Sequence, residues 1–368
     1  MLILLILCSA VSCIACGMLL RYGRSNGRRY GRSLPQRFHT GHTPRLGGIA
    51  MMLACTAGWM WIVGAQRFLA IQNQIKLPFS VALALWAVAV IAVAGGVAED
   101  LTHRLTASWR LLFTVLAGAV ATWLLGLSIP TLGIHALQAM WEATPWLAVA
   151  LAIFAVAGLP HAFNLIDGYN GLAGIVALVS CFALAYVALL NGDRQLAGIV
   201  IVLAGSTAGF LVWNYPRGLI FAGDGGAYLW GVVIAVVSIQ LVQRYEAVSP
   251  WFPVLLLIYP VWETLFSIWR KLMRGQSPGV ADALHFHQLI YRRIVRDVFD
   301  DDGARRMLLR NNRTSPYLWG FTVLTVIPAV LFWRNTPVLV FFTAVFVLSY
   351  VWAYVSIVRF KVPQWLRR

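Results

Sequence analysis

Long apolar runs dominate the hydrophobic pattern of this chain. Hydrophobic residues make up 60% of the 368 residues and charged residues only 11%, whereas about a quarter of a soluble domain is charged. A membrane-spanning helix needs ~20 mostly apolar residues. Eleven runs approach this length: 2–20, 47–64, 79–98, 110–129, 146–163, 171–190, 197–213, 225–244, 251–269, 316–333 and 337–358. Because the runs are continuous and do not alternate, a transmembrane barrel is disfavoured.

The pattern therefore predicts an all-α polytopic membrane protein with about 11 transmembrane helices, folded as a single domain over residues 1–368. The first run, 2–20, differs from a cleaved signal peptide, which carries its positive charge before the apolar core. Here arginines follow the core, beginning at Arg21 and Arg24. We therefore expect a retained first helix with its N-terminus outside the cell membrane.

Basic residues are distributed unevenly between the two sides of the predicted membrane. With the N-terminus outside, 24 of the 29 Lys and Arg residues lie on the cytoplasmic side and 5 on the other. By the positive-inside rule, this predicts a periplasmic N-terminus and a cytoplasmic C-terminus in a bacterial inner membrane. Topology and lipid headgroups then account for the net charge of +16. No nucleic-acid partner is needed to explain it.

Acidic residues are scarce, and four of them stand at the ends of apolar runs on the predicted cytoplasmic side. These are Glu99, Asp100, Asp167 and Asp224, out of only 13 acidic residues. Acids at such positions are costly and usually functional. We expect them to meet in a metal-assisted active site on the cytoplasmic face. That face is formed by the loops 21–46, 98–110, 164–170, 214–224 and 270–315.

Two of these loops carry glycine doublets beside charged residues. In HTPRLGG, Gly47 and Gly48 permit close backbone approach, and a helix N-terminus with exposed N–H groups beside Arg45 suits an anion. A plain basic turn that caps a membrane helix is an equal alternative. In FAGDGG, Asp224 begins a helix, whose N-terminus attracts phosphate. Phe221 is placed to stack on a base.

The acids of the other two loops differ in setting. Glu99 and Asp100 are adjacent, so on a helix they point about 100° apart and serve different partners. His161, Asn164 and Asp167 recur every three residues, near one helical face, before a glycine-rich turn. That loop has no Lys or Arg. Its acid therefore suits a cation or a hydrogen bond to a nucleobase, although a capped helix–turn–helix is the alternative.

The longest loop, 270–315, contains the segment HFHQLIYRR. His285 and His287 face apart on a helix but align in an extended turn. With Arg292, Arg293 and Arg296 they form a candidate anion site. Zinc is less favoured, because no third ligand stands at zinc spacing. The alternative is an amphipathic helix on the membrane surface.

Taken together, five segments in order resemble the polyprenyl-phosphate N-acetylhexosamine-1-phosphate transferase superfamily: HTPRLGGI, GVAEDL, HAFNLIDGYNGL, FAGDGGAYLWG and DALHFHQLIYRR. The versions of the first and last segments are more similar to the branch that initiates O-antigen and common antigen than to phospho-N-acetylmuramoyl-pentapeptide transferase. The resemblance departs at Glu99, where Asp is usual, and at Gln288, where a third histidine is usual. These departures leave the sugar specificity open.

The resemblance implies a set of roles. It implies a Mg²⁺ site, with Mn²⁺ as a substitute, at Asp224 and Asn164. It implies the catalytic residues Glu99, Asp100, His285 and His287, with the acidic pair at the polyprenyl phosphate and the histidines near the diphosphate. It implies the substrate-binding residues Arg45, Asp167, Asn170, Phe221, Arg292 and Arg293, with Asn170 reading uracil and Phe221 beneath it.

The expected reaction transfers an N-acetylamino sugar 1-phosphate from a UDP-sugar to undecaprenyl phosphate and releases UMP. Its product starts a lipid-linked envelope glycan of the O-antigen type. The partners are these two substrates and membrane lipid, and a homodimer is left open. The alternative function is a transporter of an anionic solute, which places broken helices near the bilayer midplane in inverted repeats. The acids here lie at helix ends instead.

Overall fold

The computed structural model describes residues 1–23, 43–68, 75–277, 284–295 and 302–359. Within these ranges it contains helices and no strands, which confirms the predicted all-α class. The helices are α1 (Leu2–Gly23), α2 (Gly47–Phe68), α3 (Phe79–Thr102), α4 (Ala107–Leu125), α5 (His135–Glu142), α6 (Pro145–Ile166), α7 (Leu172–Leu190), α8 (Arg194–Asn214), α9 (Gly223–Arg244), α10 (Trp251–Leu256), α11 (Ile258–Met273), α12 (Phe286–Arg293), α13 (Gly303–Leu331) and α14 (Thr336–Val358).

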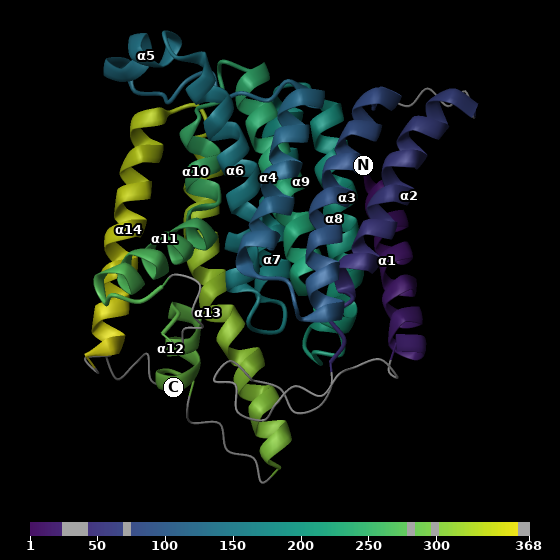
Figure 1. Ribbon diagram of the computed structural model, residues 1–368, viewed down its shortest axis with the longest axis vertical. Coiled ribbons are helices and arrows are strands. Elements are labelled where there is room, and N and C mark those ends of the chain that lie inside the picture. Colours follow the sequence, from purple (N-terminus) through teal and green to yellow (C-terminus); the bar gives the residue numbers. More distant parts are fainter. Residues whose placement is uncertain (24–42, 69–74, 278–283, 296–301, 360–368) are drawn as a thin grey trace.

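Ten helices in the described part are long and apolar enough to cross a membrane. They run side by side in Figure 1, while α5 covers one end of the bundle and α11 lies across the direction of the others. The polytopic membrane class is thereby confirmed. The side of the membrane that each end faces stays a prediction.

The predicted span 251–269, the ninth of the eleven, is wrong as a single helix. It divides into α10 and α11 at Leu257. The cause is Pro260, which has no N–H to donate to residue 256 and whose ring clashes with that carbonyl in a continuous helix. The helix that restarts is amphipathic: Trp269, Leu272 and Met273 are exposed, whereas Glu263 is buried. A mostly apolar run therefore hides a break and a polar face.

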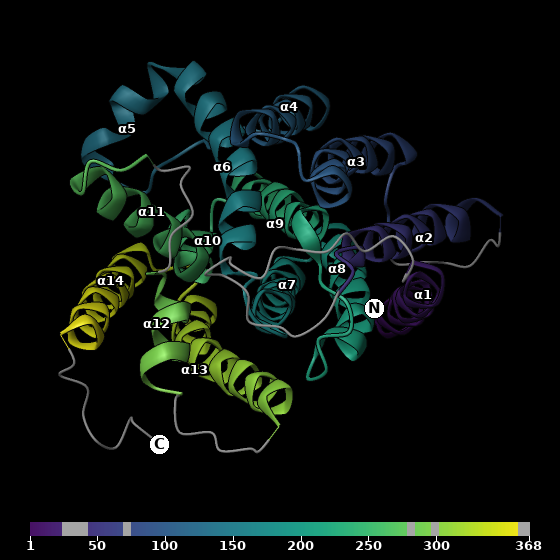
Figure 2. The ribbon, with the colours of Figure 1, turned by 60° about the horizontal axis from the view of Figure 1, so that its bottom comes forward.

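Helix α9 is the centre of the bundle. Its residues from Gly223 to Val242 are all buried, and α3, α6, α7 and α8 surround it (Figure 2). The small residue Gly231 makes the α6 contact close, because a Cβ there would collide with the backbone of Pro160. The N-terminus of α9 consequently lies deep among its neighbours.

The predicted active loops lie at one end of this bundle. The C-terminal ends of α3, α6, α8 and α14 and the N-terminal ends of α2, α4, α7 and α9 all reach the lower end in Figure 1. Helix α12 and the first half of α13 lie at the same end. The chain therefore brings four of its acids, Glu99, Asp100, Asp167 and Asp224, to one face around the start of α9.

Candidate active site

The start of α2 is bonded to the segment that leads into α9. Gly47 N donates to Phe221 O and Gly48 N to Ala222 O, both at 2.9 Å, and Phe221 N donates to Pro44 O at 2.9 Å. A Cβ on Gly48 would collide with the backbone of Gly226. This close approach explains the glycine doublet. The expectation of exposed N–H groups for an anion at α2 is wrong, since both groups are already used.

Asp100 caps the N-terminus of α9 from the end of α3. Its Oδ1 accepts from Asp224 N at 3.1 Å and its Oδ2 from Gly225 N at 3.0 Å. Gly223 makes this possible, because its φ is +70° and a Cβ there would strike the Asp100 carboxylate. A carboxylate at a helix N-terminus also interacts favourably with the helix dipole. The first α9 amides, expected to meet a phosphate, therefore already hold Asp100.

Glu99 serves a different partner, as expected for adjacent positions on a helix. Its Oε2 accepts from Leu105 N at 2.8 Å, in the α3–α4 connection. His103 ends α3 in the left-handed region, with φ of 52°, and donates its N–H to Glu99 O. Glu99 thus shapes the turn that places the first residues of α4, whereas Asp100 shapes the start of α9.

Asp224 is paired with a cation that the sequence argument did not single out. Arg110 Nη1 lies 2.9 Å from Asp224 Oδ2; the side chain of Asp224 is 6% exposed and that of Arg110 is 29% exposed. Arg110 comes from the first turn of α4. One signal pointed to it: it is one of only two basic residues in the loop 98–110 that contains the acidic pair.

Asp167 lies just beyond α6, in a partly buried position. Burial raises the pKa of its carboxyl from 3.8 to about 7; Arg45 opposes this rise and the charge of Asp224 adds to it. Arg45 itself is exposed, at the start of the described part of its loop. Asp167, Asp224 and Arg45 therefore interact across three loops, as the topology predicts.

This pKa makes stability depend on pH in a defined direction. Between pH 3.8 and about 7 the folded state binds more protons at Asp167 than the unfolded state, so stability falls as pH rises through that window. We expect metal-free protein in EDTA to melt higher near pH 6 than near pH 8, and Asp167→Asn to reduce this difference. Scanning fluorimetry measures both. The control Glu246→Gln replaces an exposed acid and should keep the wild-type difference in melting temperature between pH 6 and pH 8. If Asp167→Asn also keeps that difference, the raised pKa of Asp167 is not its cause.

Asn164 faces the same region from α6. Pro160 packs against Gly231 of α9, and α6 runs toward the site while α9 runs away from it. On α6, Asn164 lies one helical turn after Pro160, about 6 Å closer to the site than the crossing point. On α9, Asp224 lies two turns before Gly231, about 10 Å from the crossing point in the same direction. The amide of Asn164 makes no side-chain hydrogen bond to the residues that the structure describes.

Asn170 is fully buried and ties together three segments. Its Nδ2 donates to Pro216 O at 3.2 Å and to Asn312 Oδ1 at 3.0 Å. Its N–H donates to Asn311 Oδ1 at 2.8 Å, and its carbonyl accepts from Ser315 Oγ at 2.7 Å. Contact between Asn170 and uracil stays a prediction, and it requires a rearrangement of this packing. The asparagines of α13 were missed because they stand between arginines near the end of the predicted loop 270–315.

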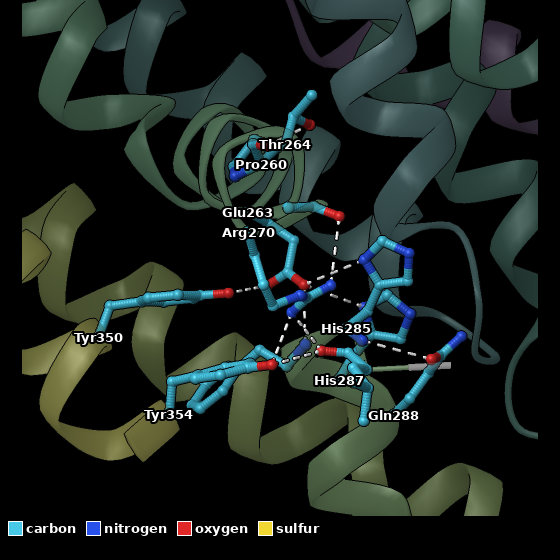
Figure 3. Close-up of polar contacts among 12 residues, drawn as sticks. Pro260, Glu263, Thr264, Arg270, His285, His287, Gln288, Tyr350 and Tyr354 are labelled. Carbon is cyan, nitrogen blue, oxygen red and sulfur yellow. Dashed lines mark hydrogen bonds and ion pairs between the residues drawn. The ribbon is translucent and has the colours of Figure 1, made fainter. Parts of the chain in front are cut away.

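The two loop histidines align as expected for an extended turn. His285 is the N-cap of α12, with φ of −65° and ψ of 148°, and its ring stacks on that of His287 at 5.4 Å and 2°. Gln288 completes the cap, because its Oε1 accepts from His285 N at 3.4 Å. Both Nδ1 atoms face Glu263 of α11 (Figure 3). Glu263 was missed because the sequence argument counted it within a membrane span.

The arginines of this loop separate. Arg293 donates to Ile357 O at 2.6 Å and to Val358 O at 2.7 Å, and so caps the end of α14. Arg292 is exposed and lowers the pKa of Tyr169, although burial raises that pKa more. Arg296 lies outside the described residues. The apolar side of α12 is buried against the protein, with Leu289 and Ile290 almost inaccessible.

A divalent cation fits the donor atoms at this site. No three His, Cys, Asp or Glu side chains in the described ranges converge closely enough to hold a metal by themselves. Mg²⁺ instead commonly binds through one or two carboxylates plus substrate phosphates. Asp224 and the unpaired amide of Asn164 are oxygen donors of that kind, and the guanidinium of Arg110 already occupies the cation position beside Asp224.

Comparison with known proteins shows which enzymes the chain is similar to. Residues 82–242 match glycosyl transferase family 4. The chain is 27% identical over 255 residues to a probable undecaprenyl-phosphate N-acetylglucosaminyl 1-phosphate transferase of Bacillus subtilis, covering 68% of this chain and 66% of that protein. It is 29% identical over 174 residues to an undecaprenyl-phosphate alpha-N-acetylglucosaminyl 1-phosphate transferase of Thermotoga maritima, covering 44% and 53%.

A third relative is a decaprenyl-phosphate N-acetylglucosaminephosphotransferase of Mycobacterium leprae, which is 28% identical over 291 residues, with 70% of each chain covered. The chain thus spans about half to two thirds of the length of the first curated relatives it matches. The matches confirm the resemblance predicted from the five sequence segments.

Proposed function

We propose that this chain, similar to the polyprenyl-phosphate N-acetylhexosamine-1-phosphate transferases, transfers an N-acetylamino sugar 1-phosphate from a UDP-sugar to undecaprenyl phosphate. The products are UMP and a polyprenyl-diphosphate sugar, which starts a lipid-linked envelope glycan of the O-antigen type. The observation that carries the proposal is the Asp224 carboxylate at the start of the central helix. Arg110 pairs with it, and Asp100 holds its backbone.

The chemistry joins two anions. An oxygen of the lipid phosphate attacks the phosphorus that carries the sugar, and the bond from that phosphorus to the bridging oxygen breaks, so that UMP leaves. The main barrier is charge repulsion and alignment, which positive charge at the site lowers. Arg110, Arg45 and Arg292 are the cations on this face that support such a role.

A bound Mg²⁺ would supply Lewis-acid stabilisation of the diphosphate, with Asp224 and Asn164 as its protein ligands. The role of the protein is to hold those ligands in place. Asp100 fixes the backbone of Asp224. The close α6–α9 contact at Gly231 fixes the position of Asn164 along the helix axis relative to Asp224. Both arrangements involve the backbone of α9, at Asp224 and at Gly231, and are present without substrate.

Asp100 acts by positioning in this proposal. Both of its carboxylate oxygens accept backbone hydrogen bonds, which leaves it poorly placed to remove a proton. A base is not required either, because the second pKa of a phosphate monoester is near ~6, so the lipid phosphate is largely dianionic at pH 7. Glu99 supports the same site by shaping the turn before α4.

We place the site on the cytoplasmic side of the bacterial inner membrane. In the sequence, 24 of the 29 basic residues fall in the predicted cytoplasmic segments, and the described parts of the loops 98–110, 164–170 and 214–224 lie at the active end of the bundle. The positive-inside rule puts that end in the cytoplasm, where nucleotide sugars are the expected donors. Tagging the described loops on either side and labelling intact cells measures this orientation directly.

One assay tests the function. Purified protein in detergent with undecaprenyl phosphate, Mg²⁺ and a panel of UDP-N-acetylamino sugars is expected to release UMP with at least one sugar. EDTA should stop the release, and added Mg²⁺ or Mn²⁺ should restore it. A folded sample that releases no UMP with any donor would exclude the proposed reaction, and release that persists in EDTA would exclude the metal.

A further inference from the structure

Glu263 is a buried carboxylate to which the proposed chemistry assigns no role. It is 1% exposed, on the inner face of α11. Its Oε1 accepts from Phe286 N at 2.8 Å, and its Oε2 accepts from Tyr350 Oη at 2.7 Å. Burial alone would raise the pKa of Glu263, but the histidines and Tyr350 outweigh burial and lower it. The carboxylate is therefore ionised, and it joins α11, α12 and α14.

The same carboxylate faces both stacked histidines. Its Oε1 lies 3.6 Å from His285 Nδ1 and 3.9 Å from His287 Nδ1. These separations are too long for hydrogen bonds. The Nδ1 of His287 has no other partner among the described residues, whereas the side chain of His285 also faces the Gln288 N–H in the cap of α12. Figure 3 shows the two rings side by side next to the carboxylate. The negative charge of Glu263 therefore faces both of these nitrogen atoms.

A negative charge at this distance selects the tautomer of a neutral imidazole. An Nδ1 that carries hydrogen is attracted to the carboxylate, whereas an Nδ1 lone pair is repelled by it, and the interaction is strong in a buried site. His287 is neutral near pH 7, because burial lowers its pKa to about 3. Its hydrogen therefore belongs on Nδ1, which leaves Nε2 with the lone pair.

The Nε2 of His287 is directed at the loop between α6 and α7. A Cβ built on Gly168 would stand 3.2 Å from this atom. Gly168 follows Asp167, and the ring of Tyr169 meets the imidazole edge-on at 5.6 Å. The absence of a side chain at Gly168 therefore leaves Nε2 at the edge of the acidic site.

We propose that Glu263 is a positioning residue that holds His287 with Nδ1 protonated and turned inward. The Nε2 of His287 is thereby presented at the edge of the acidic site. The catalytic consequence rests on the proposed transferase function, but the tautomer does not. Glu263 acts through this imidazole and touches no substrate. Replacing the charge while keeping the shape should therefore remove the tautomer preference of His287.

The test is a nitrogen-15 NMR spectrum of histidine-labelled protein in nanodiscs, without substrate. The seven histidines are assigned by single His→Asn variants. We expect the Nδ1–H tautomer at His287 in the wild type, and loss of that preference in Glu263→Gln. An Nε2–H tautomer of His287 in the wild type, or a stoichiometric metal on this ring, overturns the proposal. The wild-type spectrum decides even where the variant fails to fold.

Kinetics give the second readout. Loss of the hydrogen-bond partner of a metal-bound histidine typically costs about 10–100-fold in metal affinity or activity. By analogy, we expect a kcat loss of similar size in Glu263→Gln, with little change in KM for the UDP-sugar. Glu246→Gln, at an exposed acid just beyond the C-terminal end of α9, should keep wild-type kcat and tautomers. Wild-type kcat in Glu263→Gln would refute the role. If the wild-type protein releases no UMP, the transferase function is wrong. The NMR spectra then still test whether Glu263 sets the tautomer.

Discussion

Asp224→Asn is expected to lower kcat for UMP release by about 10²–10³-fold, the range found when one charge-stabilising group is lost from an active site. Asparagine keeps the shape of the side chain but removes the charge that would hold Mg²⁺. The Mg²⁺ concentration for half-maximal rate should therefore rise as well. Both quantities come from a Mg²⁺ titration of UMP release at saturating lipid and donor.

The fold should survive this substitution. Asp100 bonds to the backbone N–H groups of Asp224 and Gly225, and not to the side chain of Asp224. The ion pair that is lost involves Arg110, which is 29% exposed, and partly exposed pairs contribute little. We therefore expect a Tm close to that of the wild type. A large fall in Tm would mean that the lost activity reports misfolding.

Arg110→Gln is the matched control, because it breaks the same ion pair from the other side. If Asp224 binds the metal, Arg110 competes with it, and Arg110→Gln should lower the Mg²⁺ concentration for half-maximal rate. Asp224→Asn should shift that concentration the other way. If the two variants lose activity equally and neither changes the Mg²⁺ dependence, Asp224 serves only as the partner of Arg110, and the metal assignment is wrong.

Much of the fold followed from run length alone. The ten helices of membrane-spanning length could be predicted from the sequence, because long uninterrupted apolar stretches have few other stable structures in a membrane. The break at Leu257 was not visible, since Pro260 is itself compatible with an apolar run. Glu263 was missed for a related reason: one acid within an apolar stretch does not show that the helix is amphipathic and lies across the others.

The site was predictable as a location and less so as a set of contacts. Topology places Asp100, Asp167 and Asp224 together, because each stands at the span end that faces the predicted cytoplasmic side. Which atoms an acid meets depends on side-chain direction and on neighbouring backbone. Asp100 and Asp224 look equivalent in the sequence, yet one accepts backbone hydrogen bonds and the other an arginine. Arg110 carried no motif of its own.

Gly96→Ala is expected to destabilise the protein and to remove most of its activity. A Cβ at Gly96 would stand 2.5 Å from the carbonyl carbon of Asp224 and 2.5 Å from Gly225 N. These are backbone atoms, so no side chain can move aside, and overpacking of this kind typically costs about 1–3 kcal/mol. The displacement falls on the turn that Asp100 holds. The Tm measured by scanning fluorimetry and the rate of UMP release should therefore both fall.

Gly158→Ala separates this steric effect from the substitution itself. Gly158 lies within α6, and a Cβ there meets no atom within 4 Å. Glycine within a helix costs roughly 0.5–1 kcal/mol relative to alanine, so this variant should match or exceed the wild-type Tm and keep its activity. If Gly96→Ala behaves like Gly158→Ala, α3 and α9 can separate without consequence. Loss in Gly96→Ala alone shows that the site depends on backbone contact between the two helices, which only a glycine at position 96 permits.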